Sequence, residues 1–294
     1  MNPGSLAPLN LDKLRTDLER YAQIVGTSYD AVFVDRLIKT LQDVWKQAWV
    51  GVRTTTHGPE ERDVNLRVCY RESLHPVRLL RTAGLVSFTH HPLENLIDDV
   101  IERFSAFWGI DAPLSGTVDK VWMFFDGGVS LRQLRGLPHL PPSLHAAQEH
   151  FDRNGMDRVG LLGLDFTRHT VNVYAPIFPP GRLTPDRVTR MITDLGFVPP
   201  SGDEAKRGAR AFSFYQTFGL ESPDILRLCF PTRCTPEEVP TQYHPVLADF
   251  VEQAPFATQR RAFLFYLAYG PKTRYFKVSS DYRANHHQMF ATVR

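Results

Sequence analysis

Several extended stretches of the sequence each contain one basic residue. Aromatic or hydroxyl side chains stand at the alternate positions next to it. Lys120 shares such a face with Trp122 and Phe124, and Lys277 shares another with Ser279. Alternate residues of a strand point to the same side, so each stretch gathers its cation and its polar groups on one face. Ammonium and guanidinium groups collected in this way suit the oxygens of a phosphate-like anion.

The clearest of these patterns is a predicted hairpin at residues 159–174, with a polar turn at 167–169. On its second strand Thr170, Asn172 and Tyr174 alternate with two valines. One face of this strand is therefore polar and the other is aliphatic.

Two interpretations of the polar faces are open. An antiparallel sheet usually turns its polar face to water, which would make the pattern an ordinary amphipathic sheet. Bulky aromatic side chains at Trp122, Tyr174 and Tyr215 have little use on a wet face, however. They favour a closed barrel with helices outside and a ligand chamber inside. Buried cations in that chamber need counter-charge, and the predicted strand faces contain few carboxylates, so a polyanionic ligand is expected to supply it.

The composition is that of a globular protein, with 43% hydrophobic and 22% charged residues among 294. A formal net charge of +2 is too small to indicate a nucleic-acid-binding surface. Cys69, Cys229 and Cys234 are odd in number and lack metal-ligand spacing, which favours a reducing compartment. No apolar run is as long as a membrane span, and the first residues do not resemble a signal peptide. We expect a cytoplasmic protein that binds neither nucleic acid nor membrane.

Helical and extended segments follow one another in a repeated order of two helices and two strands. Hydrophobic periodicity predicts the helices and nine strands, and a tenth strand is expected. The predicted helices cover residues 11–25, 32–44, 77–83, 93–108, 143–153, 185–195 and 245–253. The predicted strands cover residues 49–56, 64–70, 120–125, 159–166, 170–174, 211–217, 226–230, 262–269 and 274–279.

No segment has the composition of a long linker, and residues 176–185 and 198–208 are predicted to be surface loops. We therefore expect a single domain over residues 1–294, with a flexible N-terminus at residues 1–9. We also expect a monomer.

Other clusters of reactive residues point to weaker alternatives. Asp98 and Asp99 resemble the aspartate-rich metal motif of isoprenoid synthases, but the surrounding apolar residues are needed for packing and no second motif follows. The histidine pairs at 90–91 and 286–287 are neighbours in sequence that cannot both face one site, so surface or capping positions are favoured over a metal site. Cys229 faces the predicted lumen without a histidine partner and is interpreted as a packed thiol.

Five short motifs occur in a characteristic order: Lys120, Thr-Val-Asn-Val-Tyr at 170–174, Phe-Ser-Phe-Tyr at 212–215, Arg-Leu-Cys-Phe at 227–230 and Tyr-Phe-Lys at 275–277. Together they resemble the soluble aromatic prenyltransferases with the ABBA barrel, the enzymes of clorobiocin, naphterpin and phenazine pathways. The resemblance covers nearly the whole chain. It implies an α+β fold in which about ten antiparallel strands close into a barrel, built from ααββ repeats and surrounded by a ring of helices.

The resemblance also implies roles for individual residues. The residues that bind an allylic diphosphate would be Arg53, Thr54, Arg67, Lys120, Thr170, Asn172, Tyr215, Arg227 and Lys277. The catalytic residues would be the cations Lys120, Arg227 and Lys277 and three aromatic side chains that shield the allylic cation, Tyr174, Tyr215 and Tyr282. The acceptor pocket would contain Trp122, Ser213, Phe265 and Asp281. Asp281 and Gly160 differ from the naphterpin-branch residues, so the identity of the acceptor is not carried over.

The implied activity is transfer of a dimethylallyl group from dimethylallyl diphosphate to an electron-rich aromatic small molecule, by electrophilic aromatic substitution with release of diphosphate. Arg53 and Arg67 resemble residues of the clorobiocin branch, which uses the five-carbon donor. Asp63 lies near the metal-binding aspartate of Mg²⁺-dependent relatives, but it shares a strand face with Arg67 and is expected to pair with it. No cofactor and no essential Mg²⁺ are therefore expected. Two alternatives remain open: a geranyl-transferring relative, and a non-catalytic barrel that binds an anionic aromatic metabolite.

Overall fold

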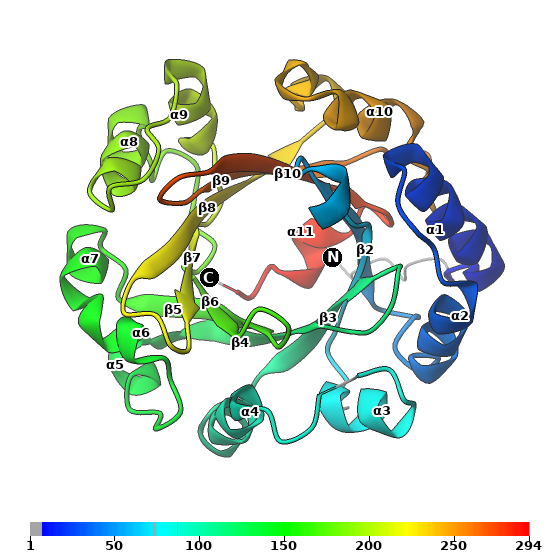
Figure 1. Ribbon diagram of the computed structural model, residues 1–294, viewed down its shortest axis with the longest axis horizontal. Coiled ribbons are helices and arrows are strands. Elements are labelled where there is room, and N and C mark those ends of the chain that lie inside the picture. Colours follow the sequence, from blue (N-terminus) through cyan, green and yellow to red (C-terminus); the bar gives the residue numbers. More distant parts are fainter. Residues whose placement is uncertain (1–7, 73–74, 87, 294) are drawn as a thin grey trace, which may run out of the picture.

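A closed barrel of ten antiparallel strands forms the centre of the computed structural model, which describes residues 8–72, 75–86 and 88–293. Helices surround this barrel in a ring, as Figure 1 shows in the view along the barrel axis. The predicted α+β barrel is therefore confirmed. The predicted flexible N-terminus lies outside the described residues, except for residues 8 and 9.

The strands follow the order of the sequence around the barrel, and the first closes onto the last. The first strand, Trp49–Thr55, pairs with the final strand. In this pairing Arg53 lies opposite Ser279 and Thr55 lies opposite Lys277. The strands are β1 (Trp49–Thr55), β2 (Asn65–Tyr70), β3 (Phe107–Pro113), β4 (Lys120–Ser130), β5 (Arg158–Asp165), β6 (Thr170–Tyr174), β7 (Tyr215–Gly219), β8 (Ile225–Cys234), β9 (Phe263–Tyr269) and β10 (Arg274–Asp281).

The helices lie mostly on the outside of the barrel and begin at local signals that are visible in the sequence. The Asn10 side chain accepts a hydrogen bond from the Lys13 amide at the start of α1, and Gly26 ends that helix with φ of 72°. The α-helices are α1 (Leu11–Val25), α2 (Ala31–Thr40), α3 (Pro76–Thr82), α4 (Pro92–Arg103), α5 (Leu131–Leu134), α6 (Pro142–Ala146), α7 (Gln148–Arg153), α8 (Pro185–Thr193), α9 (Gly202–Gly208), α10 (Pro245–Gln253) and α11 (His286–Met289). Three 3₁₀ turns complete them: η1 (Pro59–Glu61), η2 (Pro236–Glu238) and η3 (Thr241–Tyr243).

Two separate hydrophobic clusters follow from the alternation along each strand. The outward residues of the strands, such as Val50 and Val52, pack against the surrounding helices in the larger cluster. The inward residues include Trp49, Phe124 and Tyr266, which belong to a second cluster inside the barrel. Because helices cover the outside, the polar strand faces point into the lumen rather than to solvent, and the interpretation as an ordinary wet sheet is wrong.

Three segments differ from the sequence-based expectation. Residues 107–108, predicted to end a helix, instead begin β3, because α4 ends at Arg103 and Phe104 is already extended. Residues 202–208, predicted as part of a loop, form α9, which Ser201 and Glu204 start with a reciprocal capping box. The strand predicted to begin at residue 211 begins at Tyr215.

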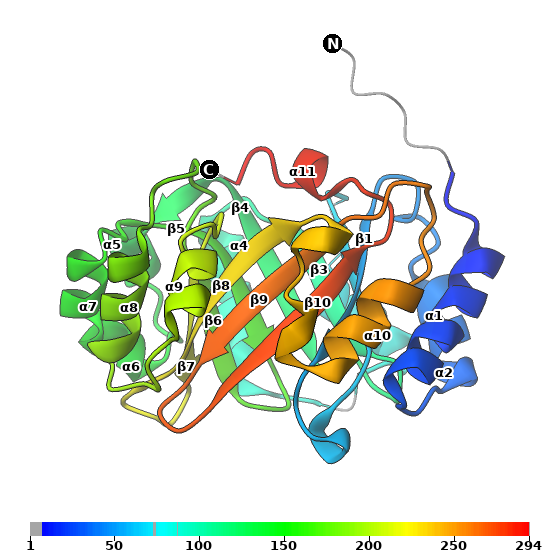
Figure 2. The same ribbon diagram turned by 90° about the horizontal axis from the view of Figure 1, so that it is seen from above.

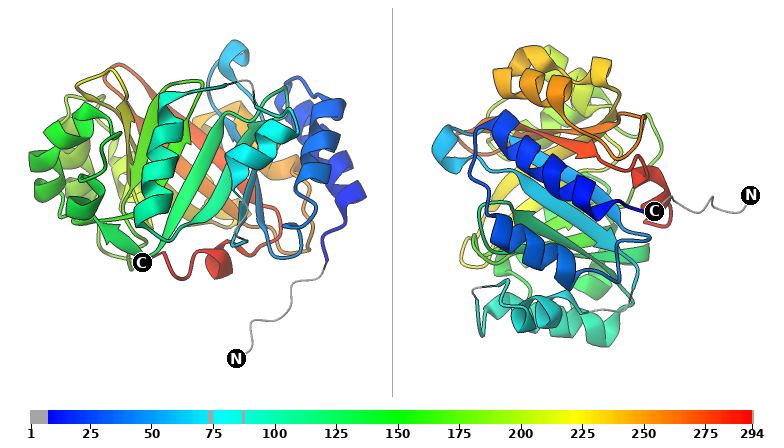
Figure 3. Two further views of the ribbon diagram at one scale, coloured as in Figure 1. Left: turned by 90° about the horizontal axis from the view of Figure 1, so that it is seen from below. Right: turned by 90° about the vertical axis from the view of Figure 1, so that its right-hand side faces the viewer.

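The two mouths of the barrel are covered differently. Figure 2 shows the C-terminal segment with α11 across one mouth, while the 3₁₀ turn η1 lies at the other. Figure 3 shows the remaining sides, with α3 and α4 against the barrel wall and α1 and α2 beside them. Among the described residues, no helix combines the length and the apolar character that crossing a bilayer requires.

Candidate active site

A cavity in the half of the barrel nearest η1 is lined by all five predicted cations, and we call it the polar chamber. Strand alternation places Arg53, Lys120 and Lys277 on the inward faces of β1, β4 and β10. Its lining residues are Arg53, Thr55, His57, Glu61, Asp63, Asn65, Arg67, Asp111, Pro113, Asp119, Lys120, Trp122, Asp165, Thr167, Arg168, Asn172, Tyr174, Tyr215, Arg227, Tyr266, Tyr275 and Lys277.

Asp111 of β3 lies between two of the arginines. One of its oxygens is 3.5 Å from Arg53 Nη2 and 3.6 Å from Arg67 Nε. The carboxylate is fully buried, and neither oxygen accepts a hydrogen bond from the described residues. Burial alone would raise the pKa of Asp111, but Arg53, Lys120 and Arg67 outweigh it and the pKa is lowered. Asp111 therefore stays ionised and neutralises one of the two guanidinium charges.

Lys120 also has a carboxylate partner. Its Nζ lies 2.8 Å from Asp165 Oδ2, and both side chains are largely buried. Burial opposes ionisation of Asp165, but Lys120 lowers the pKa of that carboxyl below its ordinary value. The neighbouring Asp119 lacks such a contact at Oδ1, and burial raises its pKa to about 7. The chamber thus contains more carboxylates than the sequence patterns indicated.

Arg227 and Lys277 remain without a carboxylate partner among the described residues. Arg227 lies over the Tyr275 ring at 5.7 Å, and Lys277 Nζ donates to the Tyr215 hydroxyl at 2.8 Å. Burial lowers the pKa of Lys277 well below its ordinary value, and Arg227, Arg53 and Lys120 lower it further. An anion is the species that would stabilise the ammonium here, so these two side chains are the cations best placed to bind one.

Two stacked tyrosines stand next to this cationic pair. The rings of Tyr174 on β6 and Tyr215 on β7 lie 4.2 Å apart at 28°, because the two residues are direct partners across the strands. Asn172 on the same face accepts a hydrogen bond from Thr217 at 2.6 Å, which fixes its amide. The aromatic faces offer electron density to a positive charge formed beside them.

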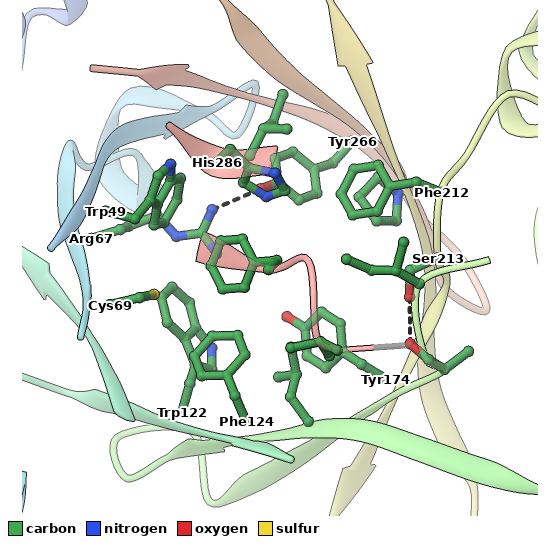
Figure 4. Close-up of a pocket in the computed structure, with 17 residues that line it drawn as sticks. Trp49, Arg67, Cys69, Trp122, Phe124, Tyr174, Phe212, Ser213, Tyr266 and His286 are labelled. Atoms are coloured by element: carbon green, nitrogen blue, oxygen red, sulfur yellow. Dashed lines mark hydrogen bonds between the residues drawn. The ribbon is translucent and has the colours of Figure 1, made fainter. Parts of the chain in front are cut away.

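A second cavity, the apolar chamber, occupies the half of the barrel nearest α11 (Figure 4). Its walls are mostly aromatic and aliphatic, as in pockets that bind apolar or aromatic small molecules. Its lining residues are Trp49, Arg67, Cys69, Trp122, Phe124, Leu161, Tyr174, Ala175, Ile177, Phe212, Ser213, Pro231, Leu264, Tyr266, His286, Phe290 and Val293.

The C-terminal segment closes the far end of the apolar chamber. Asp281, at the end of β10, accepts hydrogen bonds from the backbone amides of Asn285 at 3.2 Å and His286 at 3.1 Å, which starts α11. The same carboxylate accepts from Trp49 Nε1 at 2.9 Å. Asp281 thereby orients Trp49 and the segment that carries Phe290, without lining the chamber itself.

Two glycines leave room for the Trp122 indole in the wall of the barrel. In the strand register Trp122 lies between Gly109 of β3 and Gly163 of β5. A Cβ atom at either glycine would come within 2.8 Å of the indole ring. The indole therefore lies against bare backbone on both sides, while its buried Nε1 has no hydrogen-bond partner among the described residues.

Four residues line both chambers and form the seam between them: Arg67, Trp122, Tyr174 and Tyr266. Arg67 points into the space at this seam (Figure 4) and donates to the Tyr266 hydroxyl at 2.7 Å. Its guanidinium carbon is 4.3 Å from the Trp122 ring centroid. A ligand in the polar chamber and a ligand in the apolar chamber would meet at this boundary of one cation and three aromatic rings.

The structure brings most of the predicted site residues into the two chambers, but four predictions are wrong in placement. Asp281 was predicted to line the acceptor pocket, but it supports Trp49 and the C-terminal segment instead. Thr54 points out of the barrel and donates to the Asp63 carbonyl, so Thr55 is the inward hydroxyl. Phe265 belongs to the outer cluster, and its neighbour Tyr266 faces the lumen. Tyr282 lies beyond the end of β10 and donates to Asp17 of α1.

Other predictions need a smaller correction. Thr170 shares the inward face of Asn172 but does not line the cavity. Ser213 lines the apolar chamber, although its hydroxyl donates to the Ala175 carbonyl at 2.7 Å (Figure 4). Asp63 lines the polar chamber but accepts from Ser115 and the Val64 amide, so the predicted pairing with Arg67 is wrong.

The histidines fall into different classes. His91 starts α4 by accepting from the Leu93 amide, which confirms a capping role. His286 is buried against the apolar chamber, contrary to the surface position favoured by the sequence, and burial lowers its pKa well below the ordinary value. Within the part of the chain that the structure describes, no three histidine, cysteine or acidic side chains are grouped so as to hold a metal ion.

Several residues of the two chambers were not indicated by the sequence patterns. Asp111 lies on β3, a strand that was not predicted. Asp119 comes directly before β4, and Asp165 is the last residue of β5. His286, Phe290 and Val293 come from the short C-terminal segment, which has no periodic pattern. A strict alternation from Arg53 to Thr55 and from Leu264 to Tyr266 would have identified two inward residues that were missed.

Comparisons with known proteins agree with this geometry. A family model described as aromatic prenyltransferase Orf2 matches residues 9–293. Flaviolin linalyltransferase of Streptomyces virginiae is 27% identical over 271 residues, which cover 90% of each chain. The 5,10-dihydrophenazine-1-carboxylate 9-dimethylallyltransferase of Streptomyces anulatus is 25% identical over 279 residues, or 93% of each chain.

Solved structures with low sequence identity share the fold. A 6-dimethylallyl tryptophan synthase aligns with a TM-score of 0.59 at 14% identity, over 93% of this chain and 96% of its own. The corresponding enzyme from Micromonospora olivasterospora aligns with a TM-score of 0.54 at 13% identity, over 92% of this chain and 98% of its own.

Proposed function

This chain belongs to the family of aromatic prenyltransferases described as Orf2, and from that premise we propose that it transfers a dimethylallyl group from dimethylallyl diphosphate to an electron-rich aromatic small molecule. Prenyl transfer to an aromatic acceptor is the activity of the family. The five-carbon donor, the type of acceptor and the roles of individual residues are our proposal.

The observation that carries the proposal is the meeting of two unlike chambers at one seam. The polar chamber offers Arg227 and Lys277 without carboxylate partners among the described residues, which suits a diphosphate. The apolar chamber is lined by rings and aliphatic groups, which suits a planar acceptor. The allylic carbon would then lie beside Tyr174 and Trp122, where both chambers are lined by the same residues.

We assign ionisation of the donor to the cations of the polar chamber. Lys277, Arg227 and Lys120 stabilise the charge that grows on the diphosphate as the allylic C–O bond breaks and its electron pair leaves with the oxygen. Arg53 and Arg67, which share Asp111, contribute the remaining positive charge. Asn172 and Tyr215 are polar contacts to the same group.

We assign protection of the allylic cation to the aromatic rings. Tyr174 and Tyr215 line the polar chamber as a stacked pair, whose π electrons stabilise the positive charge and whose bulk excludes water that would quench it. The acceptor ring supplies an electron pair to the allylic carbon, a C–C bond forms, and the ring then loses a proton. Tyr282 has no part in this shield because it lies outside the barrel.

The test of the proposed function is incubation with dimethylallyl diphosphate and a set of phenolic, indole and phenazine acceptors. Prenylation adds the mass of one dimethylallyl group in place of one hydrogen and releases one equivalent of diphosphate. If aromatic acceptors bind but no donor releases diphosphate, the chain is a binding barrel and the proposal fails.

The first prediction concerns the length of the donor. With dimethylallyl and geranyl diphosphate supplied at equal concentration, we expect the five-carbon product to predominate, because Arg53 and Arg67 resemble the clorobiocin branch. The relatives do not decide this point, since one is a linalyltransferase and another a dimethylallyltransferase. Product masses give the ratio, and each donor alone gives the control rate. A predominance of geranyl product would contradict the prediction.

The second prediction is that prenylation continues in excess EDTA. Mg²⁺ would need oxygen ligands against the diphosphate, but Asp63 is already engaged by Ser115 and by the Val64 amide. The guanidinium groups of Arg53 and Arg67 lie in the same chamber and neutralise phosphate oxygens instead.

The assay compares initial rates in EDTA with and without added Mg²⁺. Asp63→Asn serves as the matched variant, because it keeps an oxygen for Ser115 while removing the charge a metal would need. We expect similar rates in all arms. Activity that EDTA abolishes, that Mg²⁺ restores and that Asp63→Asn loses would assign Asp63 as a metal ligand.

A further inference from the structure

A third cavity opens beside the apolar chamber, at the mouth that α11 covers, and we call it the vestibule. It is lined by residues 177–180 and 290–291 together with Arg233 and His287. Ile177 and Phe290 line both the vestibule and the apolar chamber. The two spaces therefore adjoin at these two side chains, on the side of the apolar chamber that faces away from the diphosphate cations.

Arg233 is the prominent charge in this cavity. It follows Arg227, Cys229 and Pro231 at alternate positions of β8, so it lies on the inward face at the end of that strand. Its guanidinium carbon stands 4.1 Å from the centroid of the Phe212 ring. Its Nε donates to His286 Nδ1 at 3.4 Å. Phe212 and His286 both line the apolar chamber, so they hold Arg233 at its border.

The charge of Arg233 is not neutralised by an ion pair within the described part of the chain. Asp281 is the carboxylate that acts on it, but the oxygens of Asp281 already accept from Trp49, Asn285 and His286. Burial lowers the pKa of Arg233. The outer guanidinium nitrogens, beyond Nε, have no hydrogen-bond partner among the described residues, and Arg233 lines a cavity whose other walls are mostly apolar.

We infer that the aromatic acceptor carries a carboxylate, which Arg233 binds from the vestibule while the reacting ring lies in the apolar chamber. This inference rests on the proposed function and names the class of acceptor. A planar guanidinium stacked on an aromatic ring presents paired N–H groups that match the two oxygens of a carboxylate. Binding the acid at this end would direct the opposite edge of the ring system toward the seam at Trp122 and Tyr174.

The experiment compares a hydroxynaphthoic acid with the corresponding hydroxynaphthamide, which has the same shape without the charge. We expect kcat/KM for the acid to exceed that for the amide by about 10-fold or more, the scale of one charge-assisted hydrogen-bonded pair. The difference should lie mainly in KM, because Arg233 is remote from the breaking C–O bond.

Arg233→Met is the main variant, because methionine keeps the apolar stem against Phe212. We expect the ratio of acid to amide to fall to about one, and Arg233→Lys to restore part of it through a point charge. Arg210→Met, which removes a surface arginine paired with Glu238, is the control and should leave the ratio unchanged. A wild-type ratio near one, or a loss in Arg233→Met that is equal for both acceptors, would overturn the inference.

A binding measurement without donor separates this inference from the proposed function. Quenching of tryptophan fluorescence reports each acceptor in the apolar chamber, which contains Trp49 and Trp122. Tighter binding of the acid that Arg233→Met abolishes would support the inference even if no prenyl transfer occurred, in which case the proposed function alone would fail. Equal binding of acid and amide would overturn the inference even if neutral phenols were prenylated.

Discussion

Replacing Lys277 with methionine is expected to lower turnover by about 10²-fold or more, the scale of losing one preorganised charge stabiliser, and at the same time to raise thermal stability. The two effects have one cause. Lys277 is 4% exposed, has no carboxylate partner among the described residues and lies near other cations. Its ammonium group therefore destabilises the folded protein when no ligand is bound, and it binds the diphosphate when the donor is present.

The size and pH dependence of the stability gain follow from linkage. Because the folded state lowers the pKa of Lys277, its penalty is absent above the unfolded value of 10.5, grows as pH falls toward the folded value, and is fully present below it. We expect methionine to raise the free energy of unfolding near neutral pH by on the order of 1 kcal/mol or more. The gain should shrink as pH rises toward 10.5.

Denaturant unfolding at several pH values measures this gain, and single-turnover kinetics measure the loss of rate. Lys272→Met, at an exposed lysine in the turn before β10, is the matched control and should change neither quantity. A less stable Lys277→Met protein, or one with wild-type turnover, would contradict the account of Lys277 as an unpaired charge reserved for the donor.

Lys120→Ala is expected to act differently, although both lysines face the same chamber. It too should lower turnover by about 10²-fold or more. Unlike the Lys277 variant, it leaves Asp165 buried and unpaired, because their 2.8 Å ion pair is lost. Breaking a buried pair on one side costs about 3–5 kcal/mol, so the variant should unfold at markedly lower denaturant concentration.

The double variant Lys120→Ala with Asp165→Asn distinguishes structure from catalysis. The asparagine side chain introduced by Asp165→Asn carries no charge and keeps an oxygen for the Arg168 amide, which in the unaltered protein donates to Asp165 Oδ1 at 2.9 Å. We expect the double variant to recover most of the stability and none of the turnover. Recovery of turnover together with stability would show that Lys120 acts only through folding.

The sequence did not predict that Lys120 has a carboxylate partner and that Lys277 has none among the described residues. Their strands were predicted and their inward faces followed from alternation, because β4 and β10 carry clear patterns of period two. The partner of Lys120 was missed because Asp165 is the last residue of β5, where a polar residue also suits a turn. Asp111 was missed because β3 begins with Phe107 and Trp108, which continue the apolar spacing of the helix before them.

The errors in placement have a related origin. Thr54 and Phe265 are each one residue away from the inward side chain, and a shift by one residue moves a side chain to the other face of a strand. Tyr282 was assigned to the lumen although β10 ends at Asp281, and beyond that residue alternation no longer applies. The C-terminal wall of the apolar chamber could not be predicted, because its contacts depend on tertiary packing across the barrel mouth.

The closure of β1 onto β10 also determines when the chambers come into existence. These strands are separated by more than two hundred residues of chain, and each chamber is bounded by residues from both ends of the sequence. A nascent chain that has not yet released β10 from the ribosome has a sheet with two open edges and no enclosed lumen. Pairing between strands so distant in the sequence is slow relative to local hairpins. Because the cations come together only in the closed lumen, the electrostatic cost of gathering them belongs to that closure, and a bound diphosphate would lower it.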